Sequence, residues 1–148
     1  MYMPEKTIIR SDTDYALRML VHLAESGPEG VATKDLSAAL NVPHGFAQKI
    51  LRQLAAVGML EAKPGRSGGF RFVKRPDDIT FADVIAAIQG PPLLNKCTGG
   101  KKICPRQPGC RVGASLRGFQ RKLDGFLAST TLADIVGVSS VTSKRRRK

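Results

Sequence analysis

The chain has 148 residues, and 24 Lys and Arg against 12 Asp and Glu give it a formal net charge of +12. Five of these positive charges fall in residues 144–148, so the rest of the chain still carries +7. A body this basic favours a polyanion such as nucleic acid, although Lys and Arg also solubilise ordinary surfaces. No segment approaches the ~20 apolar residues of a membrane-spanning helix, and residues 1–10 lack a secretory signal. We therefore expect a cytoplasmic protein without a membrane partner.

Three helices are predicted at the start of the chain. Leu17, Leu20, Val21 and Ala24 recur at helical spacing and predict a helix over 12–26 that buries them. A short helix over 31–40, with Thr33 as its N-cap, follows. A third helix over 44–57 ends at Gly58 in the manner of a glycine C-cap. The order of helix, short helix, turn and helix is typical of a helix-turn-helix protein.

The third helix has a polar and basic stripe opposite its apolar face. The stripe residues recur at i, i+3, i+4 and i+7, so they share one side of the helix, near its N-terminus. A recognition helix places such residues against base edges and phosphates in the major groove, whereas the same stripe on another protein is a solvated face. The candidate DNA-binding residues of this helix are Gly45, Gln48, Lys49 and Arg52.

A β-hairpin is predicted directly after the third helix. Short strand patterns over 59–63 and 70–73 flank a glycine-rich turn over 64–69, and basic residues surround it. Such a wing can bring its backbone close to a phosphate or into a narrow groove, although it could also be a basic surface hairpin. The candidate DNA-binding residues of the wing are Arg66, Ser67, Gly68 and Arg71.

The pattern divides the chain into four parts. Residues 8–90 form the winged helix-turn-helix domain, which ends with a helix capped by Thr80. Residues 91–113 form a loop with little hydrophobic periodicity, which a metal cluster could order. An amphipathic helix opens the region 114–136, and we expect it to pack on a second copy of the chain. Residues 137–148 form a basic tail that is expected to be disordered.

All three cysteines of the chain, Cys97, Cys104 and Cys110, lie in that loop among Lys and Arg residues. Thiolate donors favour an iron–sulfur cluster or zinc, and positive neighbours favour the thiolate form. No His, Asp or Glu occurs between Leu94 and Leu123, so a fourth ligand must come from elsewhere in the fold or from another subunit. Free reduced thiols, or a metal-free switch that pairs Cys104 with Cys110, remain alternatives.

Several motifs, in this order and spacing, make the chain resemble the Rrf-two family of bacterial winged-helix regulators, the IscR- and NsrR-like proteins. The resemblance covers about residues 8 to 136. The motifs are Asp14-Tyr15-Ala16-Leu17-Arg18, Leu51-Arg52-Gln53-Leu54, Gly65-Arg66-Ser67-Gly68-Gly69-Phe70-Arg71, the three-cysteine loop, and Thr131-Leu132-Ala133-Asp134-Ile135.

The resemblance implies a homodimeric transcription factor, usually a repressor, that reads a palindromic operator. It also implies that the three cysteines ligate a 2Fe–2S or 4Fe–4S cluster. The histidine that follows the third cysteine in IscR-like proteins is absent, because Arg111-Val112-Gly113 stands there. In NsrR-like proteins an aspartate of the partner subunit completes the site, and Asp14 matches its position, with Asp12 as a neighbouring candidate. Asp14 could also be an acidic first-turn residue that the helix dipole favours.

The sequence therefore predicts a mainly α protein with a small β-hairpin wing, a winged helix-turn-helix plus a long dimerisation helix. Its predicted function is that of a DNA-binding regulator that senses redox, iron–sulfur or nitrosative status. No enzyme is expected, because His22 and His44 have no nucleophile or carboxylate at motif spacing. A thiol-switch regulator, a zinc-stabilised regulator and an iron–sulfur electron-transfer or cluster-delivery protein remain alternatives.

Overall fold

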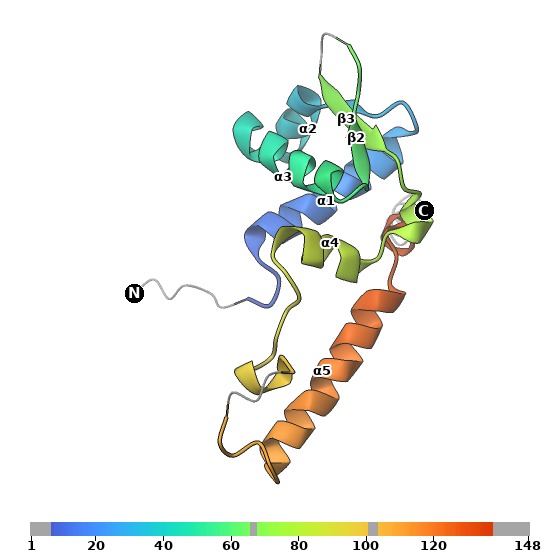
Figure 1. Cartoon of the computed structure of the whole chain (residues 1–148). Helices are drawn as coiled ribbons and strands as arrows, with labels where there is room; N and C mark the ends of the chain where they lie inside the picture. The colour runs from blue at the N-terminus through green and yellow to red at the C-terminus, as the bar shows by residue number, and fades with distance from the viewer. Residues whose placement is uncertain (1–6, 66–67, 101–103, 138–148) are drawn as a thin grey trace, which may run out of the picture.

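The computed structural model describes residues 7–65, 68–100 and 104–137. In that part of the chain, four helices and a small sheet form one body, and a fifth helix extends from it with the cysteine segment at its side (Figure 1). None of the described helices is long and apolar enough to cross a membrane. The helices are α1 Ser11–Ser26, α2 Thr33–Leu40, α3 His44–Ala56, α4 Phe81–Ile88 and α5 Arg111–Ser129. The strands are β1 Val31–Ala32, β2 Leu60–Ala62 and β3 Gly69–Phe72.

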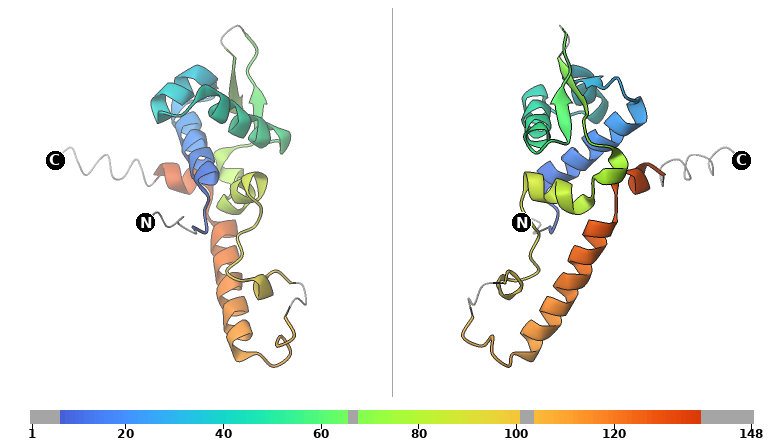
Figure 2. Two further views of the ribbon diagram at one scale, coloured as in Figure 1. Left: turned by 90° about the vertical axis from the view of Figure 1, so that its left-hand side faces the viewer. Right: turned by 45° about the vertical axis from the view of Figure 1, so that its right-hand side comes forward.

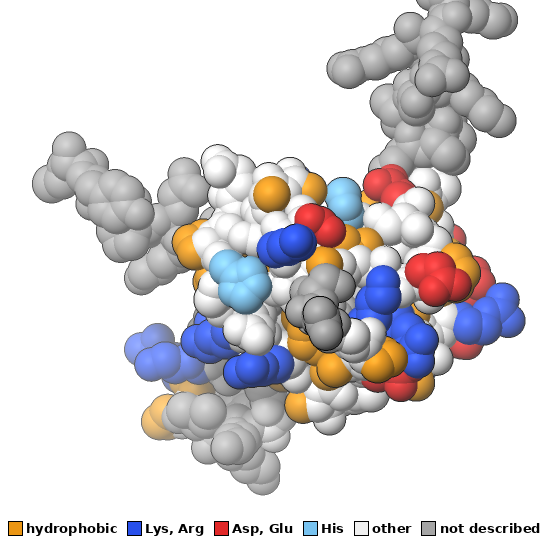
Figure 3. All heavy atoms as spheres, turned by 90° about the horizontal axis from the view of Figure 1, so that it is seen from above, with side chains coloured by type: hydrophobic (Ala, Val, Ile, Leu, Met, Phe, Trp, Pro, Cys, Tyr) orange, Lys and Arg blue, Asp and Glu red, His pale blue; other side chains and the backbone are white. Residues whose placement is uncertain are grey.

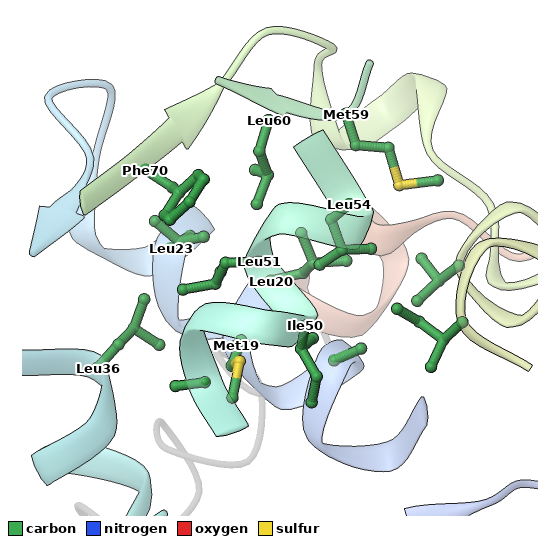
Figure 4. Close-up of a cluster of buried hydrophobic side chains, with 14 of the residues drawn as sticks. Met19, Leu20, Leu23, Leu36, Ile50, Leu51, Leu54, Met59, Leu60 and Phe70 are labelled. Atoms are coloured by element: carbon green, nitrogen blue, oxygen red, sulfur yellow. The ribbon is translucent and has the colours of Figure 1, made fainter. Parts of the chain in front are cut away.

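The core lies between α1, α3 and the sheet. Figure 4 shows side chains of α1 and α3 meeting next to Leu60 and Phe70 of the sheet. The buried face of α1 differs from the predicted one. Leu20 is buried as expected, but Leu17 and Val21 are only half-buried. They pack against the edge of the core and also line an open hollow along α1. The residues that α1 and α3 contribute are Ala16, Met19, Leu20, Leu23, Ala47, Ile50, Leu51 and Leu54.

The sheet contains a strand that the sequence pattern did not reveal. The predicted helix 31–40 starts only at Thr33, because Val31 and Ala32 pair antiparallel with β3. The strand order is β1-β3-β2, and Glu61 faces Arg71 across β2 and β3. The N-cap of α2 is Ala32, without a side-chain cap bond, so the prediction that Thr33 caps this helix is wrong.

The start of α4 follows the predicted capping box. Asp83 N–H donates to Thr80 Oγ1 over 3.1 Å, and Thr80 N–H donates to Asp83 Oδ2 over 2.9 Å. A similar box caps the helical turn 132–137, where Thr131 N–H donates to Asp134 over 2.8 Å. That backbone hydrogen bond holds the pKa of Asp134 below its usual value. The two caps lie together, because Leu132 N–H donates to Ile79 C=O over 2.8 Å.

Helix α5 begins three residues before the predicted position 114, immediately after the third cysteine. Cys110 is its N-cap, and Gly113 N–H donates to Cys110 Sγ over 3.3 Å. The far end of α5 is tied to the winged-helix body, because Phe81 N–H of α4 donates to Thr130 C=O over 2.9 Å. Residues 138–148 of the predicted tail lie outside the described part of the chain.

Candidate DNA-binding face and cysteine site

The recognition-helix candidates and the wing meet at one end of the molecule. A hollow of about 330 Å³ lies at the surface between α3 and the hairpin, and Gln48, Arg52 and Gly68 line it. Its walls also include Thr33, His44 and Lys63. Figure 3 looks onto this end of the protein and shows Lys and Arg side chains on it, while most of the acidic side chains gather at the right-hand edge. The structure thus brings three of the predicted DNA-binding residues together.

The other candidates have different surroundings. Gly45 and Lys49 are exposed on α3 outside this hollow. Arg71 donates to Glu61 over 2.7 Å, so part of its charge is already balanced within the wing. Arg66 and Ser67 lie outside the described residues. Thr33 and His44 line the hollow but were not among the predicted candidates, although His44 is the first residue of α3 and precedes the predicted stripe by one position.

The three cysteines line a second hollow, of about 700 Å³, which we call the cysteine hollow. Cys97 lies in a short 3₁₀ turn, Lys96–Thr98, and Cys110 caps α5. All three are free thiols, and Cys104 is exposed while the other two are half-buried. The loop therefore places its thiols around one space although it has no apolar core of its own.

Gln120 attaches the cysteine segment to α5. This side chain is 5% exposed, and its Oε1 accepts from Leu94 N–H over 2.9 Å and from Thr98 Oγ1 over 3.0 Å. Its Nε2 donates to Pro92 C=O over 2.9 Å and to Asp124 Oδ1 over 2.8 Å. One buried amide thus holds the segment on both sides of Cys97. Nothing in the local pattern around Gln120 indicated this role, because its partners in the cysteine segment lie more than twenty residues earlier.

Two polar atoms beside the cysteine hollow are buried without a hydrogen-bond partner in the described part of the chain. They are Gln107 Oε1 and Arg117 Nη1, and both residues line the hollow. Buried polar groups are normally paired, so this unpaired guanidinium nitrogen can still donate to an acceptor or anion in the hollow. The thiolate donors and this guanidinium fit an iron–sulfur cluster. Among the described residues, however, no three His, Cys, Asp or Glu side chains come as close together as the ligands of one metal ion.

Asp14, the candidate fourth ligand, is not at the cysteine hollow of its own chain. It lines the hollow along α1 with Leu17 and Val21, and Arg18 Nε donates to its Oδ2 over 2.8 Å. This hydrogen bond raises the pKa of the Arg18 guanidinium. The views in Figures 1 and 2 place the cysteine segment along the N-terminal half of α5, away from the start of α1. Within one chain, Asp14 and the three thiols therefore stay apart.

A helix-turn-helix followed by a basic hairpin defines a winged-helix transcriptional regulator. Residues 9–137 match the model of the Rrf2 (Rrf-two) family, described as an iron-dependent transcriptional regulator, and the chain belongs to this family. It is 31% identical over 140 residues to the HTH-type transcriptional regulator NsrR of Geobacillus kaustophilus, covering 90% of this chain and 95% of that protein. It is 30% identical over 126 residues to the HTH-type transcriptional repressor NsrR of Streptomyces coelicolor, covering 84% of each chain.

Solved structures agree on the fold. CymR, titled the global cysteine regulator of B. subtilis, superposes with a TM-score of 0.69 at 23% identity over 92% of this chain and 98% of that one. IscR of T. potens gives a TM-score of 0.69 at 19% identity over 88% and 87%. The predicted winged-helix fold and the assignment as a DNA-binding transcriptional regulator rather than an enzyme are confirmed.

Proposed function

We propose that the protein is a dimeric regulator, most simply a repressor, that binds a palindromic operator and responds to an iron–sulfur cluster. The observation that carries this proposal is the gathering of three free thiols around one hollow on a segment joined to a winged helix. Soft thiolate donors select iron–sulfur clusters over hard cations. The name of the matched family, an iron-dependent regulator, supports the same assignment.

The proposed dimer uses an apolar stripe on α5. Val112, Phe119 and Phe126 are 69%, 57% and 68% exposed and recur every seven residues. Large apolar side chains left uncovered along a helix typically pack on another subunit. Two copies joined along α5 present two recognition helices, as a palindromic operator requires. The partner subunit could then supply Asp14, which its own chain keeps away from the thiols.

The chain's own residues connect the thiols to the DNA-binding face. Gln120 fixes the Cys97 segment on α5, and Thr130 at the end of α5 accepts a hydrogen bond from Phe81 of α4. Helix α4 packs in turn on the recognition helix α3. When bound, the cluster supplies a group reactive toward oxidants and nitric oxide, whose loss frees the three thiols. A small rotation of the two recognition helices then lowers affinity at both half-sites.

Anaerobic purification with iron and sulfide analysis tests the cofactor. We expect a coloured protein with bound iron, loss of that iron in Cys104→Ser, and reduced iron retention in Asp14→Ala. Cys104 is the best cysteine to replace because, unlike Cys110, it does not cap a helix, so its loss should disturb the fold least. Asp12→Ala is the matched control, since it removes a neighbouring carboxylate of the same helix. A zinc-loaded protein, or equal iron loss in both aspartate variants, would contradict the proposed ligand set.

A metal-free thiol switch is the second candidate, favoured by the exposure of Cys104, which lines the same hollow as the half-buried Cys110. In this case the wild-type protein is colourless, and oxidation changes operator binding through a Cys104–Cys110 disulfide. Cys104→Ser then makes operator binding insensitive to oxidant in iron-free protein. An electron-transfer or cluster-delivery role would instead gain support if selection from genomic DNA fragments enriched no palindrome.

Gln48→Ala is expected to change which operator sequence is preferred. Gln48 projects from α3 into the hollow beside the wing, and a glutamine that pairs with a base edge contributes about 1–3 kcal/mol of discrimination. The measurement is binding to a panel of operators that differ at single positions. Arg66→Ala is the contrasting variant, expected to weaken binding to all sequences and to flatten its salt dependence. An unchanged preference profile for Gln48→Ala would remove this residue from the base contacts.

A further inference from the structure

Arg117 of α5 borders the cysteine hollow in a way that the proposed ligand set does not explain. Its Nη1 atom is buried and has no hydrogen-bond partner among the described residues. A guanidinium stays protonated in proteins, so this nitrogen keeps its share of a positive charge. Leaving a buried nitrogen of a charged group unpaired is unfavourable, and an anion in the hollow would offset this cost.

The described lining of the hollow contains no carboxylate to serve as that anion. Its acidic groups are the three thiols alone, and its other charged side chains, Lys96 and Arg106, are exposed cations. Solvent screens exposed charges far more than buried ones. Among these three cations, Arg117 is therefore the one whose charge is least screened by solvent inside the hollow.

Because Gly113 has no side chain, the Arg117 guanidinium can approach the sulfur of Cys110. A Cβ atom built at Gly113 would lie 3.1 Å from Arg117 Nη1 and 3.5 Å from Cys110 Sγ. The cation and the sulfur thus border the same small gap, one helical turn into α5. An alanine at this position would require the guanidinium to shift by a few tenths of an ångström.

We infer that Arg117 is the counter-ion of the iron–sulfur cluster and sets its reduction potential. This inference rests on the proposed cluster. A cluster held by thiolates and a carboxylate is negative, and each electron that it accepts makes it more so. A guanidinium beside the cluster, with one nitrogen shielded from solvent, stabilises the reduced form more than the oxidised form. Arg117 therefore raises the reduction potential, and its charge also favours retention of the assembly.

The test compares three variants of the full-length protein, reconstituted anaerobically with ferrous iron and sulfide. Arg117→Met removes the charge and keeps an unbranched side chain, whereas Arg117→Lys keeps the charge. Arg121→Met is the matched control, because it removes one charge from an exposed position on the same helix. The readouts are the midpoint potential in a spectroscopic titration and the iron affinity in competition with a chelator.

We expect Arg117→Met to have a more negative potential and an iron affinity lower by about tenfold to a hundredfold, as for other residues just outside a ligand set. Arg117→Lys should lie nearer to wild type, and Arg121→Met should equal it. Equal values in Arg117→Met and wild type, or equal shifts in Arg121→Met, would overturn the inference. Loss of the cluster in both Arg117 variants would also overturn it, because retention of the cluster would then not depend on the charge at this position. A wild-type protein that takes up no iron would refute the proposed cofactor itself.

Discussion

Gln120→Leu is expected to lower the free energy of unfolding by about 2–4 kcal/mol and to release the Cys97 segment from α5. The substitution leaves Pro92 C=O and Leu94 N–H without the amide that satisfies them. Each buried polar group that loses its partner costs about 1–3 kcal/mol. Leucine fills a similar volume, so the effect reports the lost hydrogen bonds more than a cavity.

Urea unfolding measures the stability, and the rate of alkylation of Cys97 measures the release of the segment. Cys97 should react faster in Gln120→Leu than in wild type, while the exposed Cys104 should change little. Gln120→Glu separates the two halves of the amide, since it keeps an acceptor for Leu94 and Thr98 but loses the donor to Pro92. It also sets a second carboxylate against Asp124, so its stability should fall at least as far as that of Gln120→Leu. Unchanged stability and unchanged Cys97 reactivity in Gln120→Leu would show that Gln120 does not hold this segment.

Gly69→Ala is expected to destabilise the protein by about 1–3 kcal/mol and to weaken binding to every operator sequence. The added Cβ would lie 2.3 Å from Val31 C=O and 2.8 Å from Ala32 Cα, both backbone atoms that cannot rotate away. The pairing of β1 with β3 would have to open. Because β3 is one strand of the wing, its displacement would also move the hairpin away from α3.

Gly45→Ala is the control for stability, since a Cβ at Gly45 meets no atom within 4 Å. In a helix, alanine is favoured over glycine by up to about 1 kcal/mol, so the same substitution should have the opposite sign there. Thermal unfolding of both variants, with operator binding of Gly69→Ala, provides the measurement. If Gly69→Ala were as stable as wild type, the close approach of β1 and β3 would not limit this position.

The sequence by itself determined the elements whose signals are local. Apolar spacing located α1 and α3, glycine ended α3 at Gly58, and the Thr80–Asp83 box placed the start of α4. The hairpin and its basic surroundings followed from strand patterns around a glycine-rich turn. These features depend on residues within a few positions of one another, which is why periodicity and capping rules detect them. The motif order was sufficient to indicate the family.

Only the tertiary structure decided how the cysteine segment is held and what surrounds its thiols. The bonds from Gln120 to Leu94 and Pro92 span 26 and 28 residues, and no periodic pattern encodes such a pair. Strand β1 was not predicted for the same reason. Two residues form a strand here only because β3 lies beside them. The three cysteines were visible in the sequence, but the Arg117 guanidinium beside them, with one nitrogen buried, was not. Its position depends on the gap at Gly113 and on the fold of the whole segment against α5.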